Sequence, residues 1–187
     1  AHGRWLVRFP GTGGGRDASP GKRLRIKNKK QLEQLLLPLR KMIGCKSVKI
    51  QMETLVYFAY TNALRQKKGI KTVSPNLHSA FLGSPGTGKT TVARLYSHIL
   101  FKLGYLSKGH LIETSRADLV AGYIGQTAQR VRACAESARG GVLFIDEAYS
   151  LAPAPPMDDF GPEAIAELIQ VMENCRDDLV VIFAGYS

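Results

Sequence analysis

The 187-residue sequence has few cysteines, and they follow no recognisable pattern. Cys45, Cys134 and Cys175 are odd in number, are widely spaced and form no CxxC pair. This argues against a disulfide framework and a cysteine-based metal site, and it predicts reduced thiols in an intracellular protein. The four histidines, at positions 2, 78, 98 and 110, have no metal-ligand spacing either, so we expect no metal site built from them.

Long apolar runs are also missing from the sequence. No run approaches the ~20 residues that a membrane helix needs. Apolar residues make up 44% of the chain and charged residues 22%, which is ordinary for a soluble globular protein. We therefore expect a cytoplasmic protein with one α/β domain and no membrane partner. An organelle stroma is the alternative location, because residues 1–28 are rich in Arg and poor in acids, although transit peptides are usually richer in Ser.

Acidic residues are scarce at the start of the chain. Residues 1–50 contain 13 Lys and Arg but only Asp17 and Glu33, so this segment accounts for the whole net charge of +11. Residues 51–187 carry 13 residues of each sign. A sequence-independent phosphate-binding surface requires clustered basic side chains on the folded part. We therefore interpret the excess as a solvated basic leader, and rank a nucleic-acid remodelling ATPase last among the candidate functions.

Apolar periodicity divides the chain into three parts. Residues 1–28 have almost none, which predicts a disordered or loosely attached leader. Residues 29–74 contain two amphipathic helices, separated by a break at Ile43-Gly44. Residues 75–187 form the remaining core. The expected inward positions of the two helices are Leu32, Leu35, Leu36, Leu39 and Met42, then Val48, Met52, Leu55, Val56, Ala59 and Ala63.

The most specific motif is a glycine-rich loop, Gly83-Ser84-Pro85-Gly86-Thr87-Gly88-Lys89-Thr90, followed by Thr91. A short apolar run precedes it and a helical pattern follows, which is the context of a loop that binds a nucleoside triphosphate. The backbone amides from Gly86 to Lys89 would point at the phosphates. Lys89 would neutralise phosphate oxygens, and the Thr90 hydroxyl would hold magnesium.

Two acids follow a second apolar run, 56 residues after Thr90. Four consecutive apolar residues, 142–145, predict a strand buried on both faces of a parallel sheet. Asp146 and Glu147 come directly after it, where two charges are unfavourable unless they have a role. We assign Asp146 to magnesium and Glu147 to the base that polarises the attacking water. A helix after Pro162 and a buried strand over 179–184 continue the α/β pattern.

Tyr123 and Ile124 lie in a loop bracketed by Gly122 and Gly125. The preceding strand is expected over 109–114 and the following helix over 127–138. By composition alone the aromatic and aliphatic pair is as compatible with a plug of the core as with a surface that grips a partner chain.

The assembled pattern resembles the AAA+ ATPases, and within them the CbbX/CfxQ group, which includes the red-type Rubisco activases. The segments that carry the resemblance are LSKGHLIETSRADLVAGYIGQTA, GGVLFIDEAYSLA, DDFGPEAI and RDDLVVIFAGY. The resemblance covers roughly residues 38–187. The resemblance implies an α/β P-loop NTPase fold, a parallel sheet sandwiched by helices that corresponds to the AAA+ large subdomain, without the helical lid.

The same resemblance implies roles for individual residues. Residues 83–91 become the Walker A loop, Asp146 and Glu147 the Walker B pair, and Tyr123-Ile124-Gly125 a pore loop that grips a polypeptide. The turn at Ile43-Gly44 would pack against the adenine. The implied function is ATP hydrolysis, with Mg²⁺, by a homo-oligomer, usually a hexamer, that remodels a protein client such as Rubisco. The alternative is a non-catalytic module whose assembly depends on nucleotide.

The sequence departs from the family pattern at two places. Tyr186 stands where many AAA+ proteins have a polar sensor residue, often Asn, which argues against a sensor function there. The arginine finger, the second sensor and the lid lie beyond Ser187 in the family, and Arg176 is expected to be a surface residue. We therefore expect the chain alone to bind ATP but to hydrolyse it poorly.

Overall fold

The computed structural model describes residues 6–8, 24–42, 46–70, 72, 75–123, 125–152 and 160–186. The first part of the chain contains β1 (Leu6–Arg8), α1 (Lys29–Lys41), α2 (Lys46–Lys67), β2 (Ser79–Leu82) and α3 (Lys89–Leu103). The second part contains β3 (Leu111–Thr114), α4 (Arg116–Leu119), α5 (Gln126–Ala138), β4 (Val142–Ile145), the 3₁₀ helix η1 (Ala148–Leu151), α6 (Gly161–Asn174) and β5 (Val180–Gly185).

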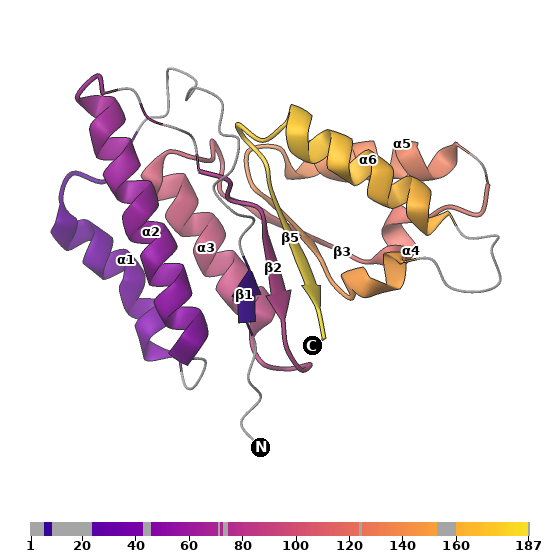
Figure 1. The fold of residues 1–187 in the computed structure, drawn as a ribbon, viewed down its shortest axis with the longest axis horizontal. Coiled ribbons are helices and arrows are strands. Elements are labelled where there is room, and N and C mark those ends of the chain that lie inside the picture. Colours follow the sequence, from indigo (N-terminus) through magenta and orange to yellow (C-terminus); the bar gives the residue numbers. More distant parts are fainter. Residues whose placement is uncertain are drawn as a thin grey trace.

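The five strands form one sheet in the order β1-β2-β5-β4-β3. The strands β2, β5, β4 and β3 are parallel, and β1 pairs with β2 in the antiparallel direction (Figure 1). Parallel pairing brings the carboxyl ends of β2, β5 and β4 to the same edge of the sheet, where open α/β sheets bind ligands. The order also places β5, the last strand of the chain, between the two strands that precede the predicted site motifs.

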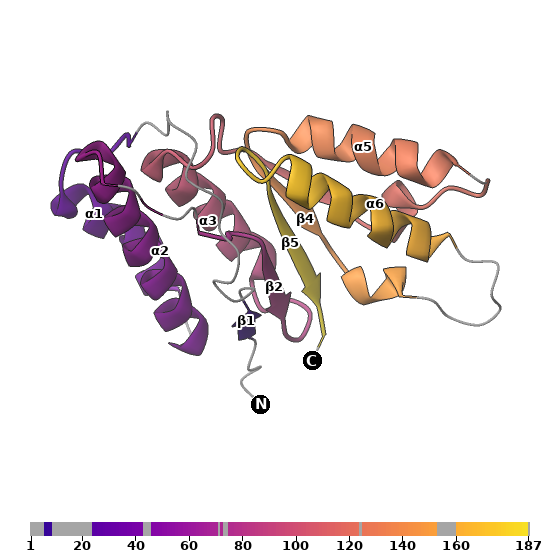
Figure 2. The ribbon, with the colours of Figure 1, turned by 45° about the horizontal axis from the view of Figure 1, so that its top comes forward.

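Helices cover both faces of the sheet. The helices α1, α2 and α3 lie on one side, and α4, α5 and α6 lie on the other (Figures 1 and 2). The sheet has a hydrophobic core on each face: the first core includes residues of α1, α2 and α3, and the second core includes residues of α4, α5 and α6. The strand β4 is buried on both faces, because Val142 and Phe144 pack into the first core while Leu143 and Ile145 pack into the second. The predicted helix-covered parallel sheet is therefore confirmed. None of the helices in the described ranges is both long and apolar enough to cross a membrane.

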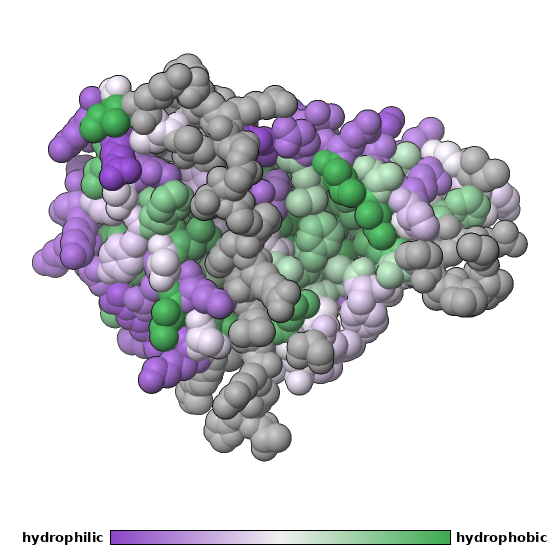
Figure 3. Space-filling view, viewed as in Figure 1, coloured by the Kyte–Doolittle hydropathy of each residue, from purple (hydrophilic) through white to green (hydrophobic). Residues whose placement is uncertain are grey.

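The second face is covered less completely near β2. Phe81 of β2 is fully buried in the first core, whereas Ala80 and Leu82, which point the other way, are only partly buried. On α6, Ile169 is 63% exposed. Figure 3 shows apolar surface beside α6 and β5. An apolar strip thus remains at the surface on the α6 side of the sheet.

The two predicted helices at the start of the fold are present as α1 and α2. Asn28 caps α1, because its side-chain oxygen accepts a hydrogen bond of 3.0 Å from the backbone N–H of Gln31. The predicted inward residues Leu32, Leu36 and Leu39 are fully buried, and so are Val48, Met52, Val56 and Ala59 of α2. Leu35 and Leu55 are only partly buried at the edge of this core.

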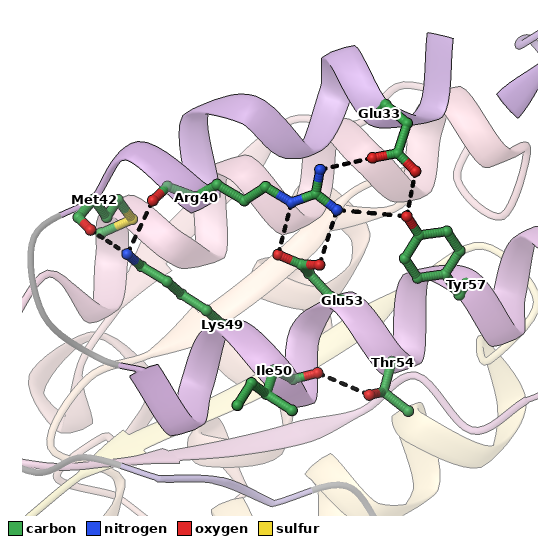
Figure 4. Close-up of polar contacts among 8 residues, drawn as sticks. All are labelled: Glu33, Arg40, Met42, Lys49, Ile50, Glu53, Thr54 and Tyr57. Carbon is green, nitrogen blue, oxygen red and sulfur yellow. Dashed lines mark hydrogen bonds and ion pairs between the residues drawn. The ribbon is translucent and has the colours of Figure 1, made fainter. Parts of the chain in front are cut away.

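Arg40 joins the two helices through a charged network (Figure 4). Its guanidinium donates two hydrogen bonds of 2.9 Å to the Glu53 carboxylate and one of 2.6 Å to Glu33. The Tyr57 hydroxyl also donates to Glu33. Lys49 donates to the backbone oxygens of Arg40 and Met42, so it satisfies carbonyls at the end of α1. The network fixes how α1 lies against α2.

Part of the basic leader contacts the core, which differs from the sequence-based expectation of loose attachment. The strand β1 pairs with β2, and Ile26 is buried at 6% exposure. Arg25 donates to the backbone oxygens of Phe101 (2.6 Å) and Leu106 (3.1 Å), and its guanidinium lies 4.2 Å from the Phe101 ring centre. The expectation is therefore wrong for these two segments. The division into leader, helical segment and core stays a prediction.

His78 joins β2 to β5 as a buried, neutral imidazole. Its Nδ1 accepts a hydrogen bond of 2.9 Å from the Val181 N–H, and its Nε2 lies 3.3 Å from the Met172 carbonyl oxygen. Because Nδ1 accepts, Nε2 must carry the proton and donate to Met172. Burial lowers the pKa of His78 below its usual value. A second proton would remove the acceptor for Val181 and add an uncompensated charge to the interior.

We expect the free energy of unfolding to fall as the pH is lowered from 7 to 5. The unfolded histidine binds a proton near pH 6.5, whereas folded His78 stays neutral at lower pH. Its contribution is therefore present above pH 6.5 and is lost below it, by up to about 1.4 kcal/mol per pH unit. Urea denaturation at several pH values measures this slope.

Two variants assign the slope to His78. In His78→Asn the amide oxygen can replace Nδ1 as the acceptor for Val181 but cannot titrate, so the slope should decrease. His98, on the exposed side of α3, provides the matched control in His98→Asn. Equal slopes in wild type and His78→Asn would contradict this prediction.

Candidate functional site

The predicted loop and the predicted acids meet at one edge of the sheet. The loop follows β2, Asp146 and Glu147 follow β4, and Tyr186 follows β5, which lies between the other two strands. Together they enclose a pocket of about 330 Å³. The residues that line it are Pro85, Gly86, Gly88, Lys89, Thr90, Thr91, Asp146, Glu147, Gly185 and Tyr186.

The glycine loop has the conformation that its sequence demands. Gly86 and Gly88 have φ angles of 71° and 85°, in the left-handed region where side chains other than glycine are strained. Gly88 directly precedes the 15-residue helix α3, so the amides at the helix N-terminus face the pocket. The Gly83 N–H donates to the Gly185 oxygen at 2.9 Å, which ties the start of the loop to the end of β5. The result is a preformed cradle for an anion.

Lys89 is buried in this cradle at 8% exposure. Its ammonium donates to the backbone oxygens of Gly83 (2.7 Å) and Ser84 (2.9 Å). Carbonyl oxygens compensate the charge only in part, because they carry no formal charge of their own. The geometry therefore places a positive charge beside the amides of the loop.

The two acids line the same pocket from the end of β4, and both are exposed. The Asp146 N–H donates to the Thr114 oxygen at 2.8 Å, which continues the β3–β4 pairing, and Asp146 Oδ1 accepts from the Glu147 N–H at 2.9 Å. Glu147 has a φ of 49°, and within the described ranges it is the one non-glycine residue with a positive φ. Such a conformation costs about 1–3 kcal/mol and is common at functional sites.

Two tyrosines in the site were not assigned a role from the sequence. The Tyr186 hydroxyl donates to Glu147 Oε1 at 3.1 Å, and its ring centre lies 5.1 Å from that of Tyr149. Hydrogen bonds with Tyr149 and Glu147 raise the pKa of Tyr186 to about 12, so the phenol stays protonated and remains a donor at neutral pH. The signal available in the sequence was the position of Tyr186 directly after a buried strand, at the same sheet edge as the acids.

Tyr123 lies away from this pocket and is 73% exposed. Tyr123 therefore does not fill the core, whereas its role in contacting a partner polypeptide stays a prediction. Thr127, which is fully buried, accepts a hydrogen bond of 3.0 Å from the Ala121 N–H and so fixes the base of the loop. Gly125, the residue directly before α5, has a φ of 79°. Ile124 lies outside the described residues.

The predicted adenine contacts Ile43 and Gly44 also lie outside the described residues. The residue before them, Met42, reaches the glycine loop, since its Cε would lie 3.4 Å from a Cβ placed on Gly88. The end of α1 is thus adjacent to the glycine loop. Among the described side chains, no cluster of three or more His, Cys, Asp and Glu could hold a metal by itself.

Comparison with known proteins identifies the family of this site. The sequence profile of the ATPase family associated with various cellular activities (AAA) matches residues 79–187, which include the loop and both acids. The chain belongs to the AAA family. This confirms the predicted resemblance to the AAA+ ATPases, and it agrees with the parallel sheet and its covering helices.

Several curated proteins are similar to this AAA chain. The chloroplastic ribulose bisphosphate carboxylase/oxygenase activase of Cyanidioschyzon merolae is 52% identical over 158 residues, which cover 84% of this chain and 54% of the relative. A CfxQ homolog of Cyanidium caldarium is also 52% identical, over 84% of this chain and 55% of its own length. CbbX of Cereibacter sphaeroides is 50% identical, over 79% and 48%. The chain thus spans about half the length of these relatives.

Proposed function

We propose that this AAA chain binds ATP with magnesium and hydrolyses it within a ring of identical subunits that remodels a protein client. The observation that carries the proposal is the convergence of the loop lysine and two acids on a single pocket. A phosphate cradle alone would support binding. The pair Asp146 and Glu147 in the same pocket adds the groups that hydrolysis requires.

The residues present fit a magnesium nucleotide. The amides at the start of α3 and the Lys89 ammonium would bind phosphate oxygens, and Ile43 and Gly44 would contact the adenine. Met42, the residue before them, lies beside Gly88 of the loop, which supports this assignment. The Thr90 hydroxyl and the Asp146 carboxylate are hard oxygen ligands, and Mg²⁺ is usually held by one or two such groups together with substrate phosphates. The ion would supply positive charge that stabilises the phosphoryl group during transfer.

Glu147 would act as the base in hydrolysis. Its carboxylate accepts a proton from water, the water oxygen forms a bond to the γ-phosphorus, and the bond from that phosphorus to the bridging oxygen breaks. ADP and inorganic phosphate are the products. Lys89 and the loop amides stabilise the negative charge that moves onto the leaving oxygen.

The relatives and the exposed Tyr123 support a proposal for the client and the assembly. One relative is named as an activase of Rubisco, and we propose Rubisco as the client of this chain. Tyr123, with Ile124 and Gly125, would contact the client polypeptide in the centre of a hexameric ring. The cytoplasm is the proposed location, with the stroma as the alternative that the chloroplastic relative favours.

Lys89→Ala is expected to raise the Kd for ATP about 10- to 100-fold, because charge-assisted hydrogen bonds to phosphate are worth about 1.5–3 kcal/mol. Isothermal titration calorimetry with ATP and Mg²⁺ measures the change. Lys68→Ala removes an exposed lysine just after α2 and should leave the Kd unchanged. Equal affinities in wild type and Lys89→Ala would show that the loop is not the phosphate site.

A further inference from the structure

We infer that Tyr186 is a positioning residue that sets the orientation of Glu147 for hydrolysis. This inference rests on the proposed function, in which Glu147 is the base. The sequence pattern argued against a sensor function at Tyr186, because an aromatic residue stands where many family members have a small polar one. The structure places its hydroxyl on the base itself, 3.1 Å from Glu147 Oε1.

The contact matters because the Glu147 side chain lies at an exposed position. A glutamate side chain has several rotatable bonds, and ordering it costs up to about 1.5–2 kcal/mol of entropy. Tyr186 donates to Oε1, and in the proposed reaction the other oxygen, Oε2, would accept the proton from water. A base must hold this geometry closely, because misplacement by about 1 Å can lower a rate 100-fold. The donated hydrogen bond is a direct means of holding it.

Tyr186 is itself held by its neighbours. Its ring packs against Tyr149 of η1, with ring centres 5.1 Å apart and planes tilted by 39°. Gly185 makes this packing close, since a Cβ at that position would lie 3.3 Å from Tyr149 Cδ1. Packing against Tyr149 of η1 therefore restricts the rotation of the Tyr186 ring and holds its hydroxyl in place.

The same ring also contacts the phosphate side of the pocket. The Lys89 ammonium lies 5.7 Å from the ring centre of Tyr186, within the range of a cation–π interaction. Tyr186 thus lies between the lysine that follows β2 and the acid that follows β4. Because the hydroxyl and the ring face different partners, one substitution can separate their effects.

Tyr186→Phe removes the hydroxyl and keeps the ring over Lys89. We expect kcat for ATP hydrolysis to fall about 10-fold, which corresponds to the loss of one hydrogen bond to a charged group at a partly exposed site. The Kd for ATP, measured by calorimetry, should remain unchanged, because the ring and Lys89 remain. Tyr60→Phe, which removes a hydroxyl from α2, is the matched control and should leave kcat at the wild-type value.

A double-mutant cycle tests whether Tyr186 acts through Glu147. In a Glu147→Gln background, Tyr186→Phe should cause no further decrease in single-turnover hydrolysis. An unchanged kcat in Tyr186→Phe, or a full second decrease in the double variant, would overturn the inference. Failure of the proposed function gives a different result: either the wild type itself releases no phosphate, or Glu147→Gln alone hydrolyses ATP at the wild-type rate.

Discussion

Glu147→Gln is expected to lower ATP turnover by about 10²- to 10⁴-fold, the usual contribution of a general base. Glutamine has nearly the same shape as glutamate, and its amide oxygen can still accept the hydrogen bond from Tyr186. It cannot accept a proton from water at neutral pH. ATP affinity should therefore change little, because in the proposed function the loop and Lys89, and not Glu147, bind the phosphates. Phosphate release under single-turnover conditions, with calorimetry for binding, measures both quantities.

Glu136→Gln is the matched control, since it makes the same change at an exposed position on α5 and should keep full turnover. Two outcomes would contradict the prediction for Glu147→Gln in different ways. Normal hydrolysis in Glu147→Gln would show that another group is the base. If the assembled wild-type protein binds ATP and releases no phosphate, the chain is a nucleotide-dependent assembly module instead, and oligomeric state with and without ATP would then be its functional readout.

Tyr123→Ala is expected to abolish remodelling of a client while the basal ATPase rate is retained. Tyr123 is 73% exposed and does not line the nucleotide pocket, so its truncation removes contact surface and leaves the catalytic groups in place. Truncation of a central interface aromatic typically costs 2 kcal/mol or more, about 30-fold in affinity. Rubisco in an inactive state is the probe, and recovery of its carboxylase activity is the measurement.

Tyr123→Phe separates the aromatic ring from the rest of the loop. It keeps the ring and should retain most of the remodelling, whereas the alanine variant should lose both remodelling and any stimulation of ATPase activity by the client. Full remodelling by Tyr123→Ala would exclude the gripping role. A parallel loss of basal ATPase activity would show that the loop acts on the nucleotide site, and a wild type that leaves Rubisco inhibited would exclude Rubisco as the client.

Local sequence determined most of the elements and the identity of the site. The glycines at 86 and 88 are needed for left-handed backbone, and they appear in the structure with that backbone. The apolar run 142–145 forms a strand that is buried on both faces. Successive side chains of a strand point to opposite faces of the sheet, so four apolar residues in a row favour a strand with a hydrophobic core on each face. The helices α1 and α2 follow the spacing of their leucines and valines. Each of these features depends on neighbours within a few residues.

Tertiary structure alone decided the contacts between distant segments. The sheet order places β5 between β2 and β4, and only this order brings Tyr186 onto Glu147 and His78 onto Val181. Arg25 donates to backbone oxygens at and just after the end of α3, a contact between distant segments that its own segment does not indicate, since that segment has no apolar periodicity. A periodic pattern records which face of an element is buried, but not which element covers that face. Pairing across the sheet is therefore set by the packing of the whole domain.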